Sequence, residues 1–191
     1  MRTARTTKVV VAVLAGALMG LAGSTGAHAQ SQQSYDSTAL SLSSIEAAAA
    51  TSYGLENYKS GKYLQPSGGS TANGAKIVQE TGNANLAAQH WIPVGDGTFF
   101  SLENLNSGLN LGIDGASKSA GAAAIQATGS GDLNQDWLQV SSSITNYFSM
   151  KNRNSGLCLG ISGASTANGA QAAQFACDGS ANQLWALHAT S

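Results

Sequence analysis

Short runs of alternating hydrophobic and polar residues follow one another from about residue 53 to the end of the chain. Apolar residues stand two positions apart at Tyr53/Leu55, Phe100/Leu102 and Phe148/Met150. Dipeptides such as Asn73-Gly74 and Asn168-Gly169, which favour tight turns, separate these runs. Strict alternation is typical of half-buried strands. The pattern therefore predicts many short β-strands and an all-β fold.

The same pattern occurs in three copies. Residues 100–137 align with residues 148–185 without a gap, so that SLENLNSGLNLGI stands over SMKNRNSGLCLGI. An earlier copy, residues 53–91, fits this frame after one deletion near residues 86–88, and we expect repeats at about 51–97, 98–144 and 145–191. A propeller closes with at least about four blades and solenoid coils are usually shorter, so three copies favour a closed barrel with threefold pseudosymmetry.

The N-terminal 29 residues have the pattern of a secretory signal peptide. Arg2, Arg5 and Lys8 precede an apolar run at residues 9–21, and the small-x-small segment 27–29 ends it, which predicts cleavage before Gln30. The apolar run is shorter than the roughly 20 residues that cross a bilayer. We therefore expect a secreted, extracellular protein without membrane insertion.

Residues 30–50 stand outside the repeats and are rich in Ser, Gln and Ala. This composition predicts a short flexible tail, with a short helix around residues 40–49 as the alternative. We assign the segment no function.

Charge excludes some classes of partner. Removal of Arg2, Arg5 and Lys8 from the nine lysines and arginines leaves six basic residues against ten acidic ones. The remaining cations are scattered and form no basic stripe, which argues against nucleic acid and anionic membranes as partners. Neutral ligands fit this charge balance better.

The two cysteines, Cys158 and Cys177, predict one disulfide in an exported chain, with two buried free thiols as the alternative. In the chain-entropy model a loop of this size contributes about 3 kcal/mol to the free energy of unfolding. The disulfide would therefore stabilise a domain with a small core.

Each copy ends with a Gln-x-Trp motif: Gln89-His90-Trp91, Gln135-Asp136-Trp137 and Gln183-Leu184-Trp185. The third copy continues the likeness with NSGLCLGISGASTANG, QFAC and ANQLW. In these features residues 51–191 resemble the ricin-type β-trefoil lectins and related carbohydrate-binding modules. The resemblance implies a β-trefoil, a saccharide or polysaccharide as partner, and a cysteine pair at the family's usual disulfide positions.

The motif itself is best interpreted as architecture. Trp91, Trp137 and Trp185 bring large apolar surfaces that a small core can share around a threefold axis. The glutamines Gln89, Gln135 and Gln183 can satisfy backbone groups where strands turn. We expect the tryptophans to be buried and not to contact sugar.

Sugar binding requires an aromatic face and fixed polar groups. The family supplies a carboxylate after the first cysteine-bearing strand, an aromatic residue before the second cysteine and an asparagine before Gln-x-Trp. The third copy provides Phe175 and Asn182, followed by Gln183, but Gly160 replaces the family aspartate. Ser162 or Asp178 is the expected substitute acceptor. The alternative is that Phe175 is only a core or edge residue.

The other two copies depart further from this pattern. The second keeps Asn134 and offers Asp114, but has Gly112 and Ala127 at the aspartate and aromatic positions. The first differs at all three positions, with Gln65, Glu80 and Ala88. We expect the third copy to bind best and the first to bind weakly or not at all.

Catalysis has no recognisable motif. The expected mature chain contains only the histidines His90 and His188, and it lacks Gly-x-Ser-x-Gly and His-Glu-x-x-His. We expect neither an enzyme, nor a metal site, nor a cofactor. The rival to a lectin is a β-trefoil that has lost sugar binding and acts as a protein-binding inhibitor or an envelope component.

Overall fold

The computed structural model describes residues 51–95 and 97–190. The predicted signal peptide and the tail or short helix at residues 30–50 lie outside these residues. Twelve strands occupy the described chain: β1 (Tyr53–Asn57), β2 (Tyr63–Pro66), β3 (Ile77–Glu80), β4 (His90–Gly95), β5 (Phe100–Asn104), β6 (Asn110–Ile113), β7 (Ala124–Ala127), β8 (Trp137–Ser141), β9 (Phe148–Asn152), β10 (Cys158–Ile161), β11 (Ala170–Phe175) and β12 (Trp185–Ala189). The predicted all-β fold is confirmed.

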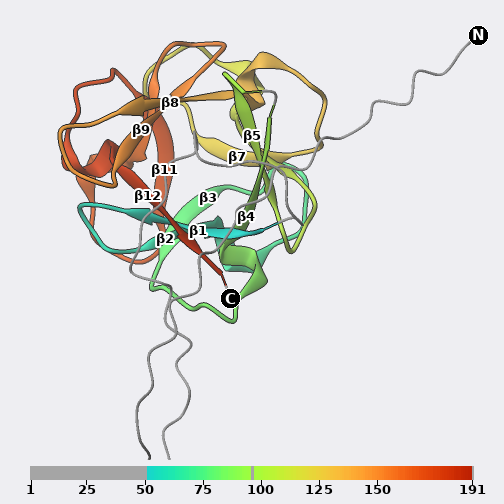
Figure 1. Ribbon diagram of the computed structural model, residues 1–191. Coiled ribbons are helices and arrows are strands. Elements are labelled where there is room, and N and C mark those ends of the chain that lie inside the picture. Colours follow the sequence, from blue (N-terminus) through green and yellow to red (C-terminus); the bar gives the residue numbers. More distant parts are fainter. Residues whose placement is uncertain (1–50, 96, 191) are drawn as a thin grey trace, which may run out of the picture.

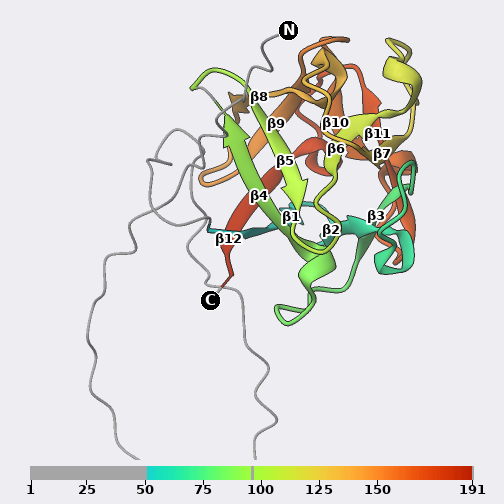
Figure 2. The same ribbon diagram turned by 90° about the vertical axis from the view of Figure 1, so that its right-hand side faces the viewer.

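Six of the strands close into a barrel. β1 pairs with β4, β4 with β5, β5 with β8, β8 with β9, β9 with β12, and β12 again with β1, all antiparallel. The longest registers, β4 with β5, β8 with β9 and β1 with β12, join one copy of the sequence pattern to the next (Figure 2). Closure leaves this barrel without an open edge.

The other six strands form three hairpins, β2–β3, β6–β7 and β10–β11. The hairpins touch one another through β3–β11 pairing and through the bridges Lys76–Ile125 and Ala123–Ala173. We call β1–β4, β5–β8 and β9–β12 the first, second and third repeats. They occupy three sectors of the molecule around a central axis (Figure 1).

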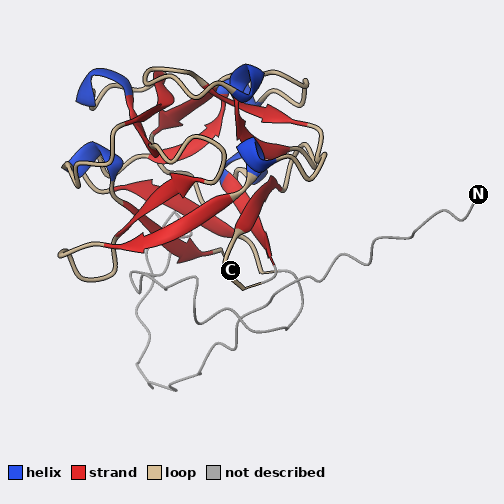
Figure 3. Ribbon diagram, turned by 90° about the horizontal axis from the view of Figure 1, so that it is seen from above, coloured by secondary structure: helices blue, strands red, loops and turns tan. Residues whose placement is uncertain are grey.

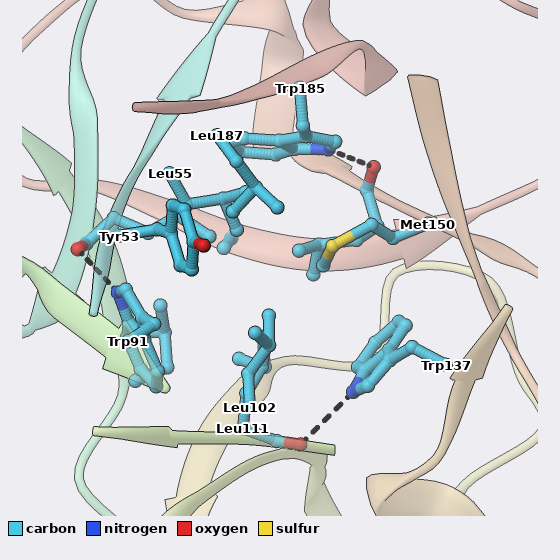
Figure 4. Close-up of a cluster of buried hydrophobic side chains, with 14 of the residues drawn as sticks. Tyr53, Leu55, Trp91, Leu102, Leu111, Trp137, Met150, Trp185 and Leu187 are labelled. Carbon is cyan, nitrogen blue, oxygen red and sulfur yellow. Dashed lines mark hydrogen bonds between the residues drawn. The ribbon is translucent and has the colours of Figure 1, made fainter. Parts of the chain in front are cut away.

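The core is shared by the three repeats. The tryptophans at positions 91, 137 and 185 are fully buried, and each indole N–H donates to a backbone carbonyl of its own repeat, at Leu64, Leu111 and Leu159, over 3.0–3.1 Å. Figure 4 shows the three indoles around a centre filled by residues such as Leu55, Leu102 and Met150. The Gln-x-Trp tryptophans therefore hold the core together and face no solvent.

Short 3-10 helices connect the strands at the periphery of the strand layers (Figure 3). In each repeat one follows the first hairpin strand, as η6 (Ser162–Ala164) follows β10. Another precedes the last strand, as η7 (Ala181–Gln183) precedes β12. These two turns of the third repeat are where the candidate site lies.

Candidate functional site

A shallow pocket of about 300 Å³ lies on the third repeat, between the end of β11 and the helices η6 and η7. Phe175 is the last residue of β11 and is half-buried. Asn182 and Gln183 line the pocket from η7. Asp178 and Ser180 line it from the segment that joins β11 to η7. We call this cavity the Phe175 pocket. It brings together the aromatic residue and the asparagine expected from the sequence.

Gly160 stands where the family aspartate is expected, and it lies close to two residues that line the Phe175 pocket. A Cβ atom at this position would lie 2.9 Å from Cγ of Gln183 and 3.3 Å from Cδ2 of Phe175. An aspartate here would therefore require Gln183 to shift and Phe175 to give way slightly. The glycine therefore removes the family carboxylate and also lets Gln183 and Phe175 pack closely over residue 160.

Asp178 places a carboxylate at the edge of the Phe175 pocket. Its Oδ1 accepts the backbone N–H of Ser180 at 2.9 Å, and the side chain is exposed to solvent. The Ser180 hydroxyl, and then its N–H, lower the pKa of Asp178, so that the group is an ionised acceptor. Ser162, the other expected acceptor, is not among the residues that line the pocket.

Asn182 is held in place by the fold. Its Nδ2 donates to the carbonyl of Ile161 at 3.2 Å, and its Oδ1 accepts the Ser180 hydroxyl at 3.0 Å. An amide nitrogen has two donors. One N–H of Asn182 therefore remains for a ligand hydroxyl.

Gln183 has a different role from Asn182. It is 3% exposed, its Nε2 donates to the Ala176 carbonyl at 2.9 Å, and its Oε1 accepts the Asp178 N–H at 3.4 Å. These bonds fix the segment that carries Asp178. Gln183 thus holds the pocket wall through its amide, the structural role expected for the motif glutamines, while it also lines the pocket as a sequence-predicted sugar contact.

The disulfide between Cys158 and Cys177 is formed, with the two Cα atoms 5.0 Å apart. Cys158 lies opposite Phe175 in the β10–β11 ladder. Cys177 belongs to the segment from Phe175 to Ser180, so the disulfide anchors the pocket wall to β10. The predicted pairing is confirmed.

The second repeat has the same backbone frame with fewer ligand groups. Asn134 donates to the Ile113 carbonyl at 3.0 Å, as Asn182 does to Ile161, and a Cβ at Gly112 would lie 3.0 Å from Gln135. Asp114 is exposed at the start of η4 (Asp114–Ala116). Ala127 ends β7 where Phe175 ends β11, so this repeat has no aromatic face at that position.

In the first repeat a side chain occupies the position that is Gly160 in the third. Gln65 is buried, and its Oε1 accepts a hydrogen bond of 2.9 Å from Nε2 of the motif residue Gln89. This amide pair fills the space with protein groups. Both amides are committed to the fold here.

Two further features bear on function. In residues 51–95 and 97–190 no three His, Cys, Asp or Glu side chains gather in a way that could hold a metal ion. The same residues contain no helix long and apolar enough to cross a membrane.

A closed six-stranded barrel, three hairpins against one end and three repeats that each bury a Gln-x-Trp motif define a β-trefoil protein, as the sequence predicted. The sequence matches the ricin-type β-trefoil lectin domain-like family over residues 42–127 and 133–191. The chain belongs to this family.

Solved structures agree with the assignment. The designed threefold-symmetric protein ThreeFoil is 34% identical, over 72% of this chain and 97% of its own, with a TM-score of 0.67. An exo-β-1,3-galactanase from Clostridium thermocellum is 33% identical, over 76% of this chain but only 32% of the enzyme, with a TM-score of 0.71. A ricin B-like lectin of Macrolepiota procera, solved in complex with lactose, shares the fold at 19% identity, over 74% of this chain and 97% of its own, with a TM-score of 0.64. Among curated protein sequences no match was found.

Proposed function

We propose that the chain is a secreted, non-catalytic carbohydrate-binding module whose main saccharide site is the Phe175 pocket. The observation that carries the proposal is the convergence of one aromatic side chain, one amide and one carboxylate on a single pocket of about 300 Å³. An aromatic ring can pack against the C–H face of a pyranose, while the amide and the carboxylate can replace the water bound to its hydroxyls.

Each residue has a role in the proposal. Phe175 provides the apolar face, the remaining N–H of Asn182 donates to a sugar hydroxyl, and Asp178 accepts from another. Gln183 and the disulfide hold the wall that carries these groups. The second repeat, with Asn134 and Asp114 but without the aromatic ring, is proposed to bind more weakly, and the first not at all.

Thermal unfolding of the purified protein with a panel of saccharides, including lactose, tests the proposal. A ligand that binds the folded state stabilises it by roughly 1.4 kcal/mol at ten times its Kd. We expect a rise in Tm with at least one saccharide. A panel that leaves Tm unchanged would favour the rival function, a protein-binding β-trefoil.

The double variant Phe175→Ala with Asn182→Ala tests the location. We expect it to lose the saccharide-dependent rise in Tm. Asn134→Ala is the matched control, because Asn134 makes the same hydrogen bond to the backbone as Asn182, at 3.0 Å against 3.2 Å, but in the second repeat. Loss of binding in the control and not in the double variant would move the site to the second repeat.

A further inference from the structure

A second pocket, of about 370 Å³, lies on the other side of the disulfide from the Phe175 pocket. Lys151 and Ser149 of β9, Val140 of β8 and Leu184 line it together with the disulfide. We call it the Lys151 pocket. Cys177 and Gly179 face it, while Ala176, Asp178 and Ser180 face the Phe175 pocket. Residues 176–180 therefore form a wall between the two pockets, and alternate residues of this segment face each pocket.

The charge of the Lys151 pocket is unusual for this protein. Of the described residues that line it, Lys151 is the one charged group and none is acidic. Lys151 is exposed and forms no ion pair with any residue in 51–95 or 97–190. At the equivalent place in the other two repeats the sequence has glutamate, Glu56 and Glu103. The third repeat therefore reverses the charge at this position.

Ser149 adds a hydroxyl to the lining of this pocket. It is only 8% exposed, lines the pocket, and its hydroxyl has no hydrogen-bond partner in the part of the chain that the structure describes. The equivalent hydroxyl in the second repeat, that of Ser101, donates to the Val94 carbonyl at 3.3 Å. Unlike the Tyr53 hydroxyl, the Ser149 oxygen is not sealed from solvent, so it can bond to a ligand or to water in the pocket. Ser141 and Ser143 add two exposed hydroxyls at the rim.

We propose that the Lys151 pocket binds the carboxylate of an acidic sugar unit. The Lys151 ammonium pairs with the carboxylate, the serine hydroxyls bond to it or to the ring hydroxyls, and Val140 and the disulfide contact the ring. The Phe175 pocket does not suit the same group, because its own carboxylate, Asp178, repels an anion. This inference rests on the proposed saccharide function and extends it from neutral sugars to uronate-containing polysaccharides.

The test compares oligogalacturonate with its methyl ester, which replaces each carboxylate by a neutral ester and adds one methyl group per unit, both titrated into the purified protein at low salt. Because the pair is solvent-exposed, we expect the acid to bind about threefold to tenfold more tightly than the ester, with the difference declining as salt is added. Lys151→Met should abolish the difference. Lys151→Glu, which introduces the residue found in the other repeats, should reverse it.

Ser149→Ala should weaken binding of the acid while leaving a neutral saccharide at the Phe175 pocket unaffected. Lys118→Met is the control, since Lys118 is an exposed lysine outside both pockets and its loss changes the net charge equally. Equal binding of acid and ester by the wild type, or an equal loss with Lys118→Met, would overturn the inference while leaving the lectin function intact. Absence of binding to every saccharide, neutral or acidic, would instead contradict the proposed function itself.

Discussion

Tyr53 places a hydroxyl in the core where the other two repeats have phenylalanine, at Phe100 and Phe148. The side chain is completely buried, and its hydroxyl has no hydrogen-bond partner within residues 51–95 and 97–190. Burial also raises the pKa of Tyr53, as expected for a phenol in apolar surroundings. On folding, this hydroxyl loses its hydrogen bonds to water and gains no partner among the described residues.

Tyr53→Phe should therefore increase the free energy of unfolding, by about 1 kcal/mol, because it removes an unsatisfied polar group and keeps the ring. Chemical denaturation measures the change. Tyr63→Phe is the opposing control, since the Tyr63 hydroxyl donates to Oε2 of Glu56 at 3.2 Å and its removal should destabilise the protein. A Tyr53→Phe variant less stable than the wild type would contradict this account.

For single residues, the sequence predicted which positions would meet in the Phe175 pocket, but not which of them would face a ligand and which would support the pocket wall. The sequence predicted Phe175 and Asn182 for the pocket from the family pattern, and both line it. It could not choose between Ser162 and Asp178, because the choice depends on the course of the segment between two turns. It also missed Ser180, whose bonds orient both Asp178 and Asn182. No motif marks that serine.

Three buried glutamines, Gln79, Gln126 and Gln174, join the hairpins of neighbouring repeats. Each Oε1 accepts a serine hydroxyl of its own repeat over 2.7–2.8 Å. Each Nε2 donates to two backbone carbonyls of another repeat over 2.8–3.0 Å: Gln79 to Ser165 and Ala167, Gln126 to Ser70 and Ala72, and Gln174 to Ser117 and Ser119. The three contacts form a cycle around the axis.

Gln126→Ala should lower the free energy of unfolding by about 2–4 kcal/mol, because it removes these bonds and leaves a gap where the buried amide was. Urea denaturation measures the loss. Gln79→Ala and Gln174→Ala should show similar losses, as the three environments are alike. A change below about 1 kcal/mol in all three variants would show that the cycle contributes little.

The elements themselves were largely predictable. Alternation and the repeat predicted the strands and the threefold plan, since both follow from side-chain periodicity within a short stretch. The glutamine cycle was not predicted, although Gln79, Gln126 and Gln174 recur at equivalent places in the repeats. Their function depends on contacts between residues far apart in the sequence, such as Gln126 and Ser70. The signal that could have revealed the cycle was the recurrence of a polar residue at the same position of a predicted strand in all three repeats.

The barrel is closed by the pairing of its first and last strands, and a contact between His188 and Glu56 spans this seam. Nε2 of His188 on β12 lies 2.7 Å from Oε2 of Glu56 on β1, and the Tyr147 hydroxyl donates to Oε1 of Glu56 at 3.3 Å. The close approach of His188 is the main cause of a lowered pKa at Glu56. Burial, and then the same carboxylate, raise the pKa of Tyr147 to about 12.

Glu56 should make the stability of the whole molecule depend on pH. Its pKa in the folded state lies below the ordinary value of 4.5, so its contribution is present above that value and is lost as the pH falls through the folded-state pKa. Glu56→Gln should cost roughly 1–2 kcal/mol at neutral pH, because a charge-assisted bond is weakened. Thermal unfolding between neutral and acidic pH should show a smaller acid loss for Glu56→Gln than for the wild type. Equal acid losses would exclude this group as the cause.

The seam between β1 and β12 also brings the two ends of the described chain together. The Thr190 N–H donates to the Ser52 carbonyl at 3.1 Å, and the hydroxyls of these residues lie 2.6 Å apart. A short peptide could therefore link residue 190 to residue 51, and the chain could be opened at a loop between two repeats instead. The pairings β4–β5, β8–β9 and β12–β1 join successive repeats in the same way, and both pockets lie within the folded repeats. Such a circular permutant should therefore retain both pockets. The three repeats can thus follow one another along the chain in a different order and still form the same binding surface.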